Sequence, residues 1–329
     1  MTEIKALDHS IWVGEDCLSK LDLSDYSSVA ILVDENTKEY CLPLLTEIEP
    51  TVIIEIKSGE ENKNINTCEY IWKKLTYYKF DRDSLLINLG GGVIGDMGGF
   101  VASTYKRGIS FIHIPTTLLA MTDASIGGKL GVNFNYLKNQ IGLFNNPSSI
   151  FINPKFLETL NENELKSGFS EIVKHALIAD KDLWSQIQGT PFNKLDLSEI
   201  IKISIKIKND IVLEDSKEEG KRKILNFGHT FGHAIESYYL KKGTSILHGE
   251  AIFMGIILET NLSKLSEFDK LNIQSYILNN FKLPYTPPKK ELINFLLNDK
   301  KNSNRRINFS LLDGIGRCSI NNLFNQNEL

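Results

Sequence analysis

The second half of the chain carries a glutamate and three histidines whose types and spacing suit a divalent metal ion. His229 and His233, in "NFGHTFGH", are four residues apart and therefore share one face of a helix. His248 stands just before another helical stretch, in "LHGEA", and Glu171 lies within the apolar stretch "GFSEIVKHAL". One glutamate with two histidines is a ligand set typical of catalytic rather than structural zinc. Spacing does not decide which two histidines are ligands, and a core or capping role is the alternative for each of them.

A glycine-rich stretch in the first half could bind phosphate groups. Residues 90–100 read "GGGVIGDMGGF" and follow an apolar run. A strand followed by glycines and a helix start leaves N–H groups that can bind a pyrophosphate. However, the acid that usually follows a dinucleotide loop by about 20 residues is missing, because that region reads "SFIHIPTTLL". By itself the loop is explained as well by a tight turn as by nucleotide binding.

Basic and hydroxyl side chains follow this loop among small residues. Arg107 precedes the run "SFIHIP", and Thr116-Thr117 follow it, where they could touch a cofactor at the carboxyl end of a strand. Lys129, directly after Gly127-Gly128, suits a phosphate as a point charge; the alternative is a surface loop with solvated lysines. Asp34, at the end of "VAILVD", could hold a ribose hydroxyl or cap a helix.

Two kinds of element must position these residues. The first half alternates the β-branched runs "SVAILVD", "TVIIEI", "SLLINLG" and "SFIHIP" with helical stretches over 37–48 and 64–78, which predicts a mostly parallel sheet covered on both faces. Beyond two Asn-Pro pairs, at 146–147 and 153–154, long helical patterns cover 162–179, 198–215, 225–240 and 249–265. The tail over 305–320 suggests a hairpin turning at Asp313-Gly314. We therefore expect an α/β domain over 1–154 and a mainly helical domain over 155–329.

Bulk composition narrows the function classes. A chain of 329 residues exceeds what one core usually holds, and its net charge of −4 argues against general nucleic-acid binding. The four cysteines form no C-x-x-C pair, which favours reduced thiols in a cytoplasmic protein. There is no signal-like N-terminus and no apolar run long enough to span a membrane. We expect a cytoplasmic enzyme with a small-molecule substrate.

Taken together, these stretches resemble the 3-dehydroquinate synthase family. The segments "GGGVIGDMGGFVASTYKRGI", "IPTTLLAMTDASIGGK", "SGFSEIVKHALI", "LNFGHTFGHAIE" and "HGEAIFMG" follow that family's order and cover residues 90–255 almost continuously. The resemblance implies a Rossmann-like N-terminal domain that binds NAD, a helical C-terminal domain that binds metal and substrate, and a homodimer. It also implies conversion of the phosphorylated sugar acid 3-deoxy-D-arabino-heptulosonate 7-phosphate to 3-dehydroquinate and phosphate, with NAD and one divalent metal ion, zinc or cobalt. In that family a transient oxidation, phosphate elimination, re-reduction and aldol closure follow one another.

The resemblance further implies roles for individual residues. The metal ligands would be Glu171, His229 and His248, with His233 on the substrate side. The residues meeting the substrate phosphate would be Arg107, reaching across the dimer, and Lys129, Asn139 and Lys300. Those near the substrate's carboxylate, ring and reacting hydroxyls would be Lys208, Arg222, Asn226, Asp123 and Lys174. Those contacting NAD would be Asp34, Asn36, Glu60, Lys63, Gly91, Gly92, Val93, Asp96, Thr116, Thr117, Lys129, Lys138 and Thr159.

Two positions depart from the family pattern. Leu130 stands where a threonine is usual, and Leu137 stands where a glycine commonly precedes Lys138-Asn139. Both could alter the backbone of the neighbouring loop. In the segment "NDKKNSNRR" we prefer Lys300 to Lys301 as the phosphate-binding lysine. The alternative functions are another sugar-phosphate cyclase, which would differ at the residues meeting the carboxylate, and a polyol or glycerol-phosphate dehydrogenase, which would release NADH.

Overall fold

The computed structural model describes residues 1–135, 137–297 and 306–329. The chain forms two compact units, Met1–Asn161 and Glu162–Leu329. Lys300 and Lys301 lie outside the described residues. None of the helices in the described ranges combines the length and the hydrophobicity that a bilayer crossing requires.

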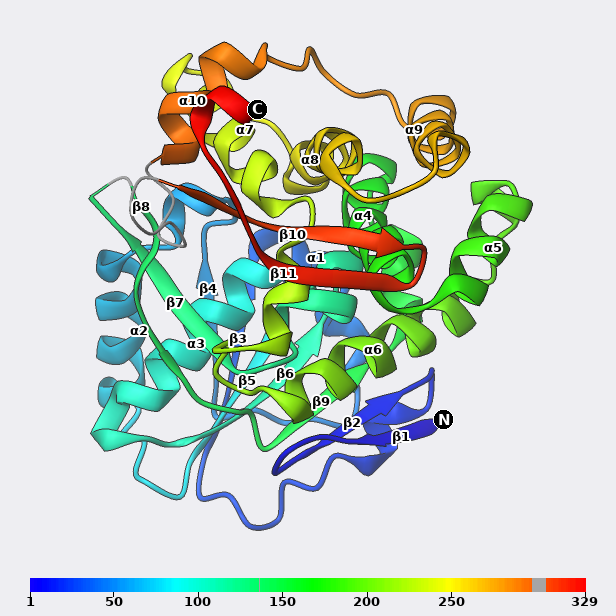
Figure 1. Cartoon of the computed structure of the whole chain (residues 1–329). Coiled ribbons are helices and arrows are strands. Elements are labelled where there is room, and N and C mark those ends of the chain that lie inside the picture. The colour runs from blue at the N-terminus through cyan, green and yellow to red at the C-terminus, as the bar shows by residue number, and fades with distance from the viewer. Residues whose placement is uncertain (136, 298–305) are drawn as a thin grey trace. The chain divides into compact units, whose positions relative to one another are not determined.

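The first unit is built on a seven-stranded sheet (Figure 1). Its spatial order is β1 (Thr2–Lys5), β2 (Ser10–Val13), β9 (Ser149–Ile152), β6 (Ser110–Pro115), β5 (Leu85–Gly90), β3 (Val29–Asp34) and β4 (Val52–Ile56). All neighbouring pairs are parallel except β1 with β2. The four β-branched runs are confirmed as β3, β4, β5 and β6. Residues of β5 are buried along its whole length, as expected of a parallel strand covered on both faces.

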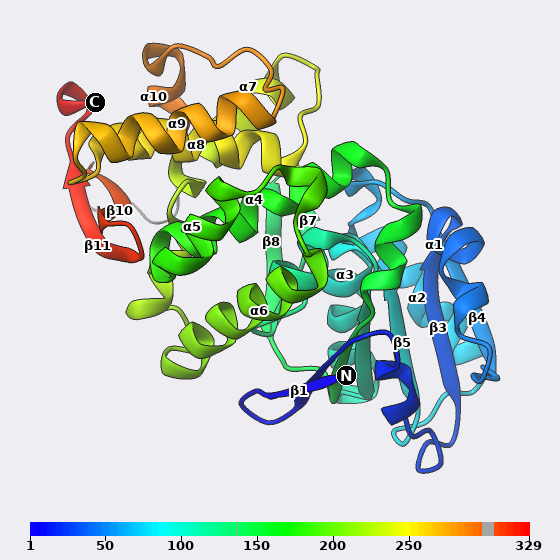
Figure 2. The same cartoon turned by 90° about the vertical axis from the view of Figure 1, so that its right-hand side faces the viewer.

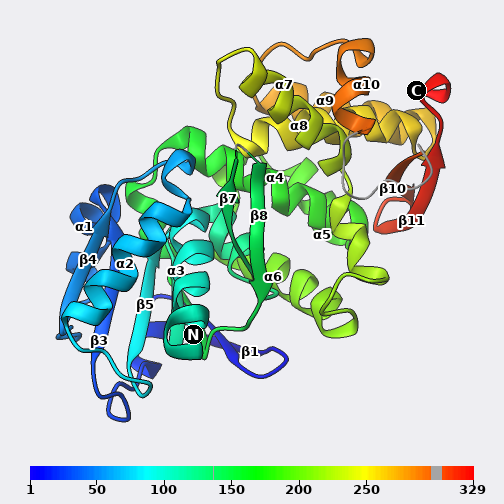
Figure 3. The same cartoon turned by 90° about the vertical axis from the view of Figure 1, so that its left-hand side faces the viewer.

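The order of the strands creates a switch point at the carboxyl ends of β3 and β5, where ligands commonly bind. After β3 and the short helix α1 (Glu35–Tyr40), the chain runs to the edge strand β4 and returns through α2 (Ile65–Tyr77) to β5, on the other side of β3 (Figure 3). The strand order therefore reverses between β3 and β5, and α/β sheets bind ligands outside the carboxyl ends of the strands at such a point. The helix α3 (Gly92–Thr104) begins there, directly after β5. The helix expected over 37–48 is shorter than predicted, because Pro43 places a 3₁₀ turn, Leu42–Leu44, after Tyr40.

A two-stranded hairpin of β7 (Lys129–Phe134) and β8 (Leu137–Phe144) completes the first unit. The stretch is therefore a hairpin rather than an irregular loop, and its Lys129 and Lys138 are exposed. Leu130 is buried in the core and packs against the Gly99 position of α3, where an added Cβ would lie 2.5 Å from its Cδ2. Leu137 is 55% exposed and pairs with Phe134 at the end of the hairpin. The first departure from the family pattern thus serves packing, and the second lies on the surface of this unit.

The second unit is mainly helical (Figure 2). Its helices are α4 (Glu162–Ala179), α5 (Lys181–Gly189), α6 (Leu197–Glu214), α7 (His229–Lys241), α8 (His248–Leu262), α9 (Glu267–Asn280) and α10 (Lys289–Leu297). The expected helix over 225–240 begins only at His229, because Lys221–Asn226 form a 3₁₀ turn and Gly228 adopts a left-handed φ of 80°. The patterns over 162–179, 198–215 and 249–265 are confirmed as α4, α6 and α8.

The predicted C-terminal hairpin is confirmed, but its turn was predicted at the wrong residues. The strands β10 (Ile307–Gly314) and β11 (Arg317–Phe324) pair antiparallel, and Gly314 lies opposite Arg317. The two turn residues are therefore Ile315 and Gly316 rather than Asp313 and Gly314. Gly316 has a φ of 77°, a value that glycine adopts without steric cost, so it marks the turn.

Candidate functional site

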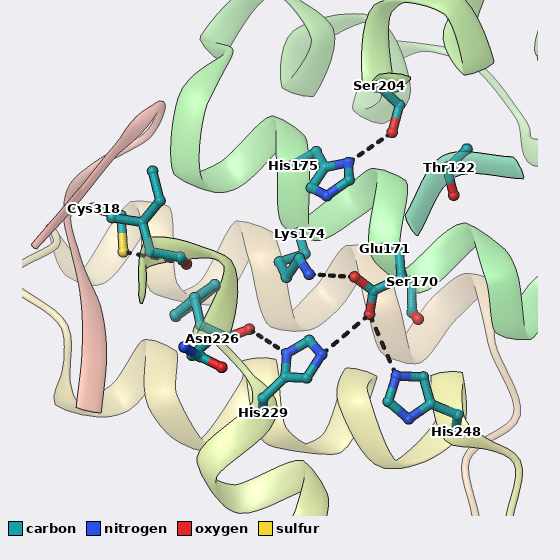
Figure 4. Close-up of polar contacts among 12 residues, drawn as sticks. Thr122, Ser170, Glu171, Lys174, His175, Ser204, Asn226, His229, His248 and Cys318 are labelled. Carbon is teal, nitrogen blue, oxygen red and sulfur yellow. Dashed lines mark hydrogen bonds and ion pairs between the residues drawn. The ribbon is translucent and has the colours of Figure 1, made fainter. Parts of the chain in front are cut away.

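Three side chains of the second unit converge on one point (Figure 4). Glu171 comes from α4, His229 from the first residue of α7 and His248 from the first residue of α8. Glu171 Oε1 lies 3.6 Å from His229 Nε2 and 3.6 Å from His248 Nε2. His229 and His248 face the glutamate, whereas His233 is not part of this group.

The distances fit a shared metal ion. A separation of 3.6 Å is too long for a hydrogen bond. Two ligand atoms each about 2.0–2.1 Å from a tetrahedral zinc ion would lie roughly 3.3 Å apart, close to the observed separation. Both carboxylate oxygens of Glu171 are buried without a hydrogen-bond partner in the described residues, although Lys174 forms an ion pair with Oε2. One buried carboxylate and two partly exposed imidazoles are therefore suited to hold a divalent cation.

The electrostatics of the cluster favour added positive charge. Burial by itself would raise the pKa of Glu171, but the charge of Lys174 and the two histidines holds that pKa well below its usual value. Burial, together with Lys174, holds the pKa of His229 well below the ordinary range, which favours the neutral imidazole that ligates metals. Burial opposes protonation of His248, yet its contacts with Glu171 and Glu236 raise its pKa to about 10. A metal ion would supply the positive charge that these two carboxylates attract.

Glycines allow the three helices to approach closely enough to form the cluster. A Cβ at Gly255 of α8 would lie 1.9 Å from the carbonyl oxygen of Gly228, just before α7. A Cβ at Gly249 would lie 2.0 Å from the carbonyl oxygen of Ser167 in α4. The Gly249 N–H also donates to Ser167 Oγ at 2.9 Å. Close backbone contact at these two points brings the starts of α7 and α8 to the Glu171 side chain.

The neighbouring candidates in this unit have different environments. Lys174 is buried beside Glu171, and His233, one turn beyond His229, is exposed with its ring 5.4 Å from that of His229. His175 is a core histidine, since its Nδ1 lies 2.7 Å from Ser204 Oγ.

The residues expected near the substrate's carboxylate and ring lie on α6 and the following 3₁₀ turn. Lys208 and Arg222 are buried, with exposed fractions of 5% and 2%. Asn226 donates from Nδ2 to Glu218 Oε1 at 2.9 Å. Asp215 accepts the backbone N–H of Arg222 at 3.0 Å and so fixes the turn that carries this arginine. Arg222 also donates from its guanidinium group to the carbonyl oxygen of Ser216.

In the first unit, the glycine loop lies at the switch point of the sheet. Gly91 stands directly before α3, and no side chain of the described residues caps the start of this helix. A small pocket lies beside it, lined by Gly90–Gly92, Asp96, Asn88, His113 and Ser125 among others. Open N–H groups at a helix start suit a phosphate group.

The acids and lysines expected near NAD form a connected network in this unit. Lys63 is 4% exposed, and its Nζ donates to Asp96 Oδ2 at 2.6 Å and to Asn139 Oδ1 at 2.7 Å. Asn133 Nδ2 donates to Glu60 Oε1 at 2.9 Å, and the Asn139 N–H donates to Asn133 Oδ1 at 2.9 Å. The start of α2, the start of α3 and the β7–β8 hairpin are therefore tied together around Lys63.

The remaining candidates of this unit lie at its loops and strand ends. Asp34 caps α1, since its Oδ1 accepts the Thr37 N–H at 2.8 Å and the Thr37 hydroxyl at 3.0 Å. The capping alternative is therefore confirmed. Thr116 is buried at the end of β6, and Asp123 is half-buried in the helical turn that follows it. The other predicted residues with intermediate or full exposure are Asn36, Gly92, Val93, Arg107, Thr117, Lys129, Lys138 and Thr159.

Glu236 and Asn133 contact residues of the site but were not predicted from the sequence. Glu236 Oε1 lies 3.4 Å from His248 Nδ1, on the side of the ring away from Glu171. It follows His233 by three residues on α7, and an acid at that spacing on a histidine-bearing helix is the signal that could have identified it. Asn133 carries no such signal, because its role depends on the β7–β8 hairpin.

Comparisons with known proteins identify the family of this chain. The family model described as 3-dehydroquinate synthase N-terminal matches residues 53–167, and the one described as 3-dehydroquinate synthase C-terminal matches residues 168–302. A relative from Parabacteroides distasonis, named 3-dehydroquinate synthase, is 41% identical over 323 residues, covering 93% of this chain and 90% of the relative.

Solved structures share the fold over nearly the whole chain. A 2-deoxy-scyllo-inosose synthase complexed with carbaglucose-6-phosphate, NAD⁺ and Co²⁺ has a TM-score of 0.86 at 24% identity, covering 99% of this chain and 97% of that one. ValA, a 2-epi-5-epi-valiolone synthase from Streptomyces hygroscopicus subsp. jinggangensis 5008 with NAD⁺ and Zn²⁺ bound, has a TM-score of 0.83 at 25% identity, covering 100% and 96%. The Rossmann-like α/β unit followed by a helical unit is thus confirmed.

Proposed function

The chain belongs to the 3-dehydroquinate synthase family, and from this premise we propose that it converts 3-deoxy-D-arabino-heptulosonate 7-phosphate to 3-dehydroquinate and phosphate. The reaction is a lyase reaction that breaks a carbon–oxygen bond to phosphate, and it belongs to the shikimate route to aromatic amino acids. The observation that carries the proposal is the convergence of Glu171, His229 and His248 on one point. This ligand set leaves a coordination position for substrate oxygens.

NAD and one divalent metal ion, zinc or cobalt, are the proposed cofactors. When bound, NAD accepts and returns a hydride, and the metal ion acts as a Lewis acid toward substrate hydroxyls. Glu171, His229 and His248 would hold the metal ion. The open start of α3 at Gly91 would hold the pyrophosphate, and the Lys63–Asp96 pair would contact NAD beside it.

The substrate carries a phosphate and a carboxylate, so cations must hold both of its ends. For the carboxylate and ring we propose the buried Lys208 and Arg222, with Asn226. For the phosphate we propose Arg107, Lys129, Asn139 and Lys300. His233, Asp123 and Lys174 are proposed to hold or exchange protons at the reacting hydroxyls, since each offers a titratable group.

We further propose roles for the two domains, an oligomeric state and a cellular location. Residues 1–154 would form the NAD-binding domain and residues 155–329 the metal- and substrate-binding domain. The active form would be a homodimer in which Arg107 reaches the substrate of the other copy. Four free cysteines suit a reducing compartment, so a cytoplasmic location is proposed.

The test is to incubate the purified protein with the heptulosonate phosphate, catalytic NAD and zinc, and to measure released phosphate. Many turnovers per NAD are expected, without net NADH, because the hydride returns to the product. Steady accumulation of NADH would instead identify a polyol or glycerol-phosphate dehydrogenase. Turnover of a sugar phosphate that lacks the carboxylate, and not of the heptulosonate, would identify another sugar-phosphate cyclase.

A further inference from the structure

A second buried glutamate, Glu259, lies in the apolar helix α8. Its side chain has an exposed fraction of 0%. Burying a carboxylate is costly unless it is paired or accepts hydrogen bonds. Glu259 Oε2 accepts the backbone N–H of Gly228 at 2.6 Å, and Oε1 accepts the backbone N–H of Phe231 at 3.0 Å. Both oxygens are therefore used to hold a short piece of backbone in another helix.

That piece of backbone is the start of α7. Gly228 is the N-cap residue and Phe231 is the third helical residue, so both N–H groups belong to the set that an α-helix leaves unsatisfied. An N-cap serine or aspartate normally accepts the N–H of the second or third helical residue, but Gly228 has no side chain to do so. Glu259 supplies the missing acceptor from α8 and places a negative charge at the positive end of the α7 dipole.

His229 lies between the two bonded residues. Its Nδ1 lies 3.2 Å from the carbonyl oxygen of Phe227, and its Nε2 faces Glu171. The direction of the imidazole therefore depends on the backbone that runs from Phe227 to Phe231. Fixing Gly228 and Phe231 fixes this backbone on both sides of the ligand.

Helix α8 thus influences the position of both histidines of the cluster: it carries His248, and its Glu259 holds the backbone beside His229. His248 is the first residue of α8, and Glu259 follows it by eleven positions, which is about three helical turns and places both on similar faces of α8. We propose that Glu259 is a positioning residue of the metal centre: it holds the first turn of α7 so that His229 meets Glu171 and His248 in ligand geometry. This inference rests on the proposed metal function of that cluster.

The test uses Glu259→Gln, with Thr260→Val as the matched control. Glutamine keeps the shape but presents an amide NH₂ to one of the two N–H donors, so one hydrogen bond is lost. Thr260 is the adjacent buried residue, and its hydroxyl has no hydrogen-bond partner in the described residues. Valine at this position therefore disturbs the same helix without changing the two hydrogen bonds that Glu259 accepts. We expect the affinity for Co²⁺, measured by competition with a chelating dye, to fall about 10- to 100-fold in Glu259→Gln, the range seen when the supports of metal ligands are removed. In Thr260→Val it should stay unchanged.

The absorption spectrum of bound Co²⁺ separates positioning from simple stabilisation, because it reports coordination geometry. In Glu259→Gln the visible bands are expected to shift or lose intensity. A folded Glu259→Gln protein with a lowered melting temperature but unchanged Co²⁺ affinity and spectrum would overturn the inference. If the original protein itself bound no Co²⁺, the proposed function would be overturned instead.

Hydrogen exchange on the unsubstituted protein tests the two hydrogen bonds to Glu259 without requiring a variant that folds. The Gly228 and Phe231 amides are expected to exchange slowly, in step with the core of α8, since both are buried and bonded to Glu259. Exchange of these two amides at the rate of a fraying helix end would show that the carboxylate does not hold them and would overturn the inference.

Discussion

Glu171 has different partners at its two carboxylate oxygens. Lys174 pairs with Oε2, whereas His229 and His248 face Oε1 from 3.6 Å. The lysine therefore keeps the carboxylate charged inside an apolar helix face, and the other oxygen remains directed at the histidines. A carboxylate held in this way is ready to ligate a cation without first losing a proton.

Replacement of single histidines should separate ligation from other roles. His248→Ala removes one of the three converging ligand atoms, so bound metal and phosphate-releasing turnover should be lost together. His233→Ala is the matched control on the neighbouring helix: it should keep the metal, because this ring is outside the triad, while losing turnover. Metal content after dialysis and phosphate release are the two measurements. Full metal occupancy in His248→Ala would contradict the assignment.

At the scale of elements, the cluster depends on how closely α7 and α8 cross. The Gly255 position of α8 faces the carbonyl oxygen of Gly228 and the N–H of Gly232, with no room for a Cβ. A larger residue would have to push the two helices apart, and His229 would then move away from His248. The glycines at this crossing therefore matter for the ligands as well as for packing.

Gly255→Ala should consequently destabilise the protein and weaken metal binding. Overpacking of this kind costs about 1–3 kcal/mol, sometimes more, and an added Cβ at 1.9 Å from a backbone oxygen places it at the upper end. Gly189→Ala, at the end of α5, is the control, because nothing lies within 4 Å of its added Cβ. Urea unfolding and Co²⁺ titration measure both effects. Equal stability of the two variants would argue against the tight crossing.

The sequence predicts many of these elements, because their signals are local. Apolar runs identify β3, β5 and β6, and helical periodicity identifies α4, α6 and α8. The choice between His229, His233 and His248 could not be predicted from spacing, since it depends on a helix crossing between residues distant in the chain. The β7–β8 hairpin was missed because its glycines and lysines also suit a loop. The turn at Ile315-Gly316 was misplaced because Asp313-Gly314 carries the stronger local turn signal.

At the scale of the whole molecule, a buried histidine should make stability depend on pH. His113 of β6 is 4% exposed and contacts Asn88 at 3.3 Å, and burial, with some repulsion from His9, lowers its pKa from 6.5 to about 3. Between these two values the unfolded chain binds a proton that the folded chain does not. The contribution of His113 is thus fully present above pH 6.5 and is lost as the pH falls.

Between pH 6.5 and about 3, each unit by which the pH falls should lower the free energy of unfolding by up to about 1.4 kcal/mol. His113→Gln removes the titrating group, so denaturant unfolding at pH 7 and pH 5 should differ less in the variant than in the original protein, by as much as about 2 kcal/mol. The carboxylates titrate alike in both proteins and cancel in this comparison. Identical differences for the two proteins would mean that His113 is not buried as a neutral imidazole.

The turn after α3 presents Arg107 in an unusual way. Lys106 and Arg107 have φ values of 50° and 69°, and Gly108 follows with 114°. Left-handed backbone at non-glycine residues costs roughly 1–2 kcal/mol each, and such strain tends to persist where a site requires it. Arg107 is exposed on this turn, so its side chain is accessible for the contact with a second copy that we propose.

Mixing two inactive variants tests whether the active site is shared between copies. Arg107→Ala and His248→Ala should each abolish turnover as homodimers, by removing a phosphate ligand and a metal ligand. In a mixed dimer, one site combines the intact His248 of the first chain with the intact Arg107 of the second, so activity should return to about half of the original per mixed dimer. Phosphate release after unfolding and refolding the two variants together measures it, with each variant refolded alone as the control. No recovery despite verified mixed dimers would show that Arg107 serves its own chain.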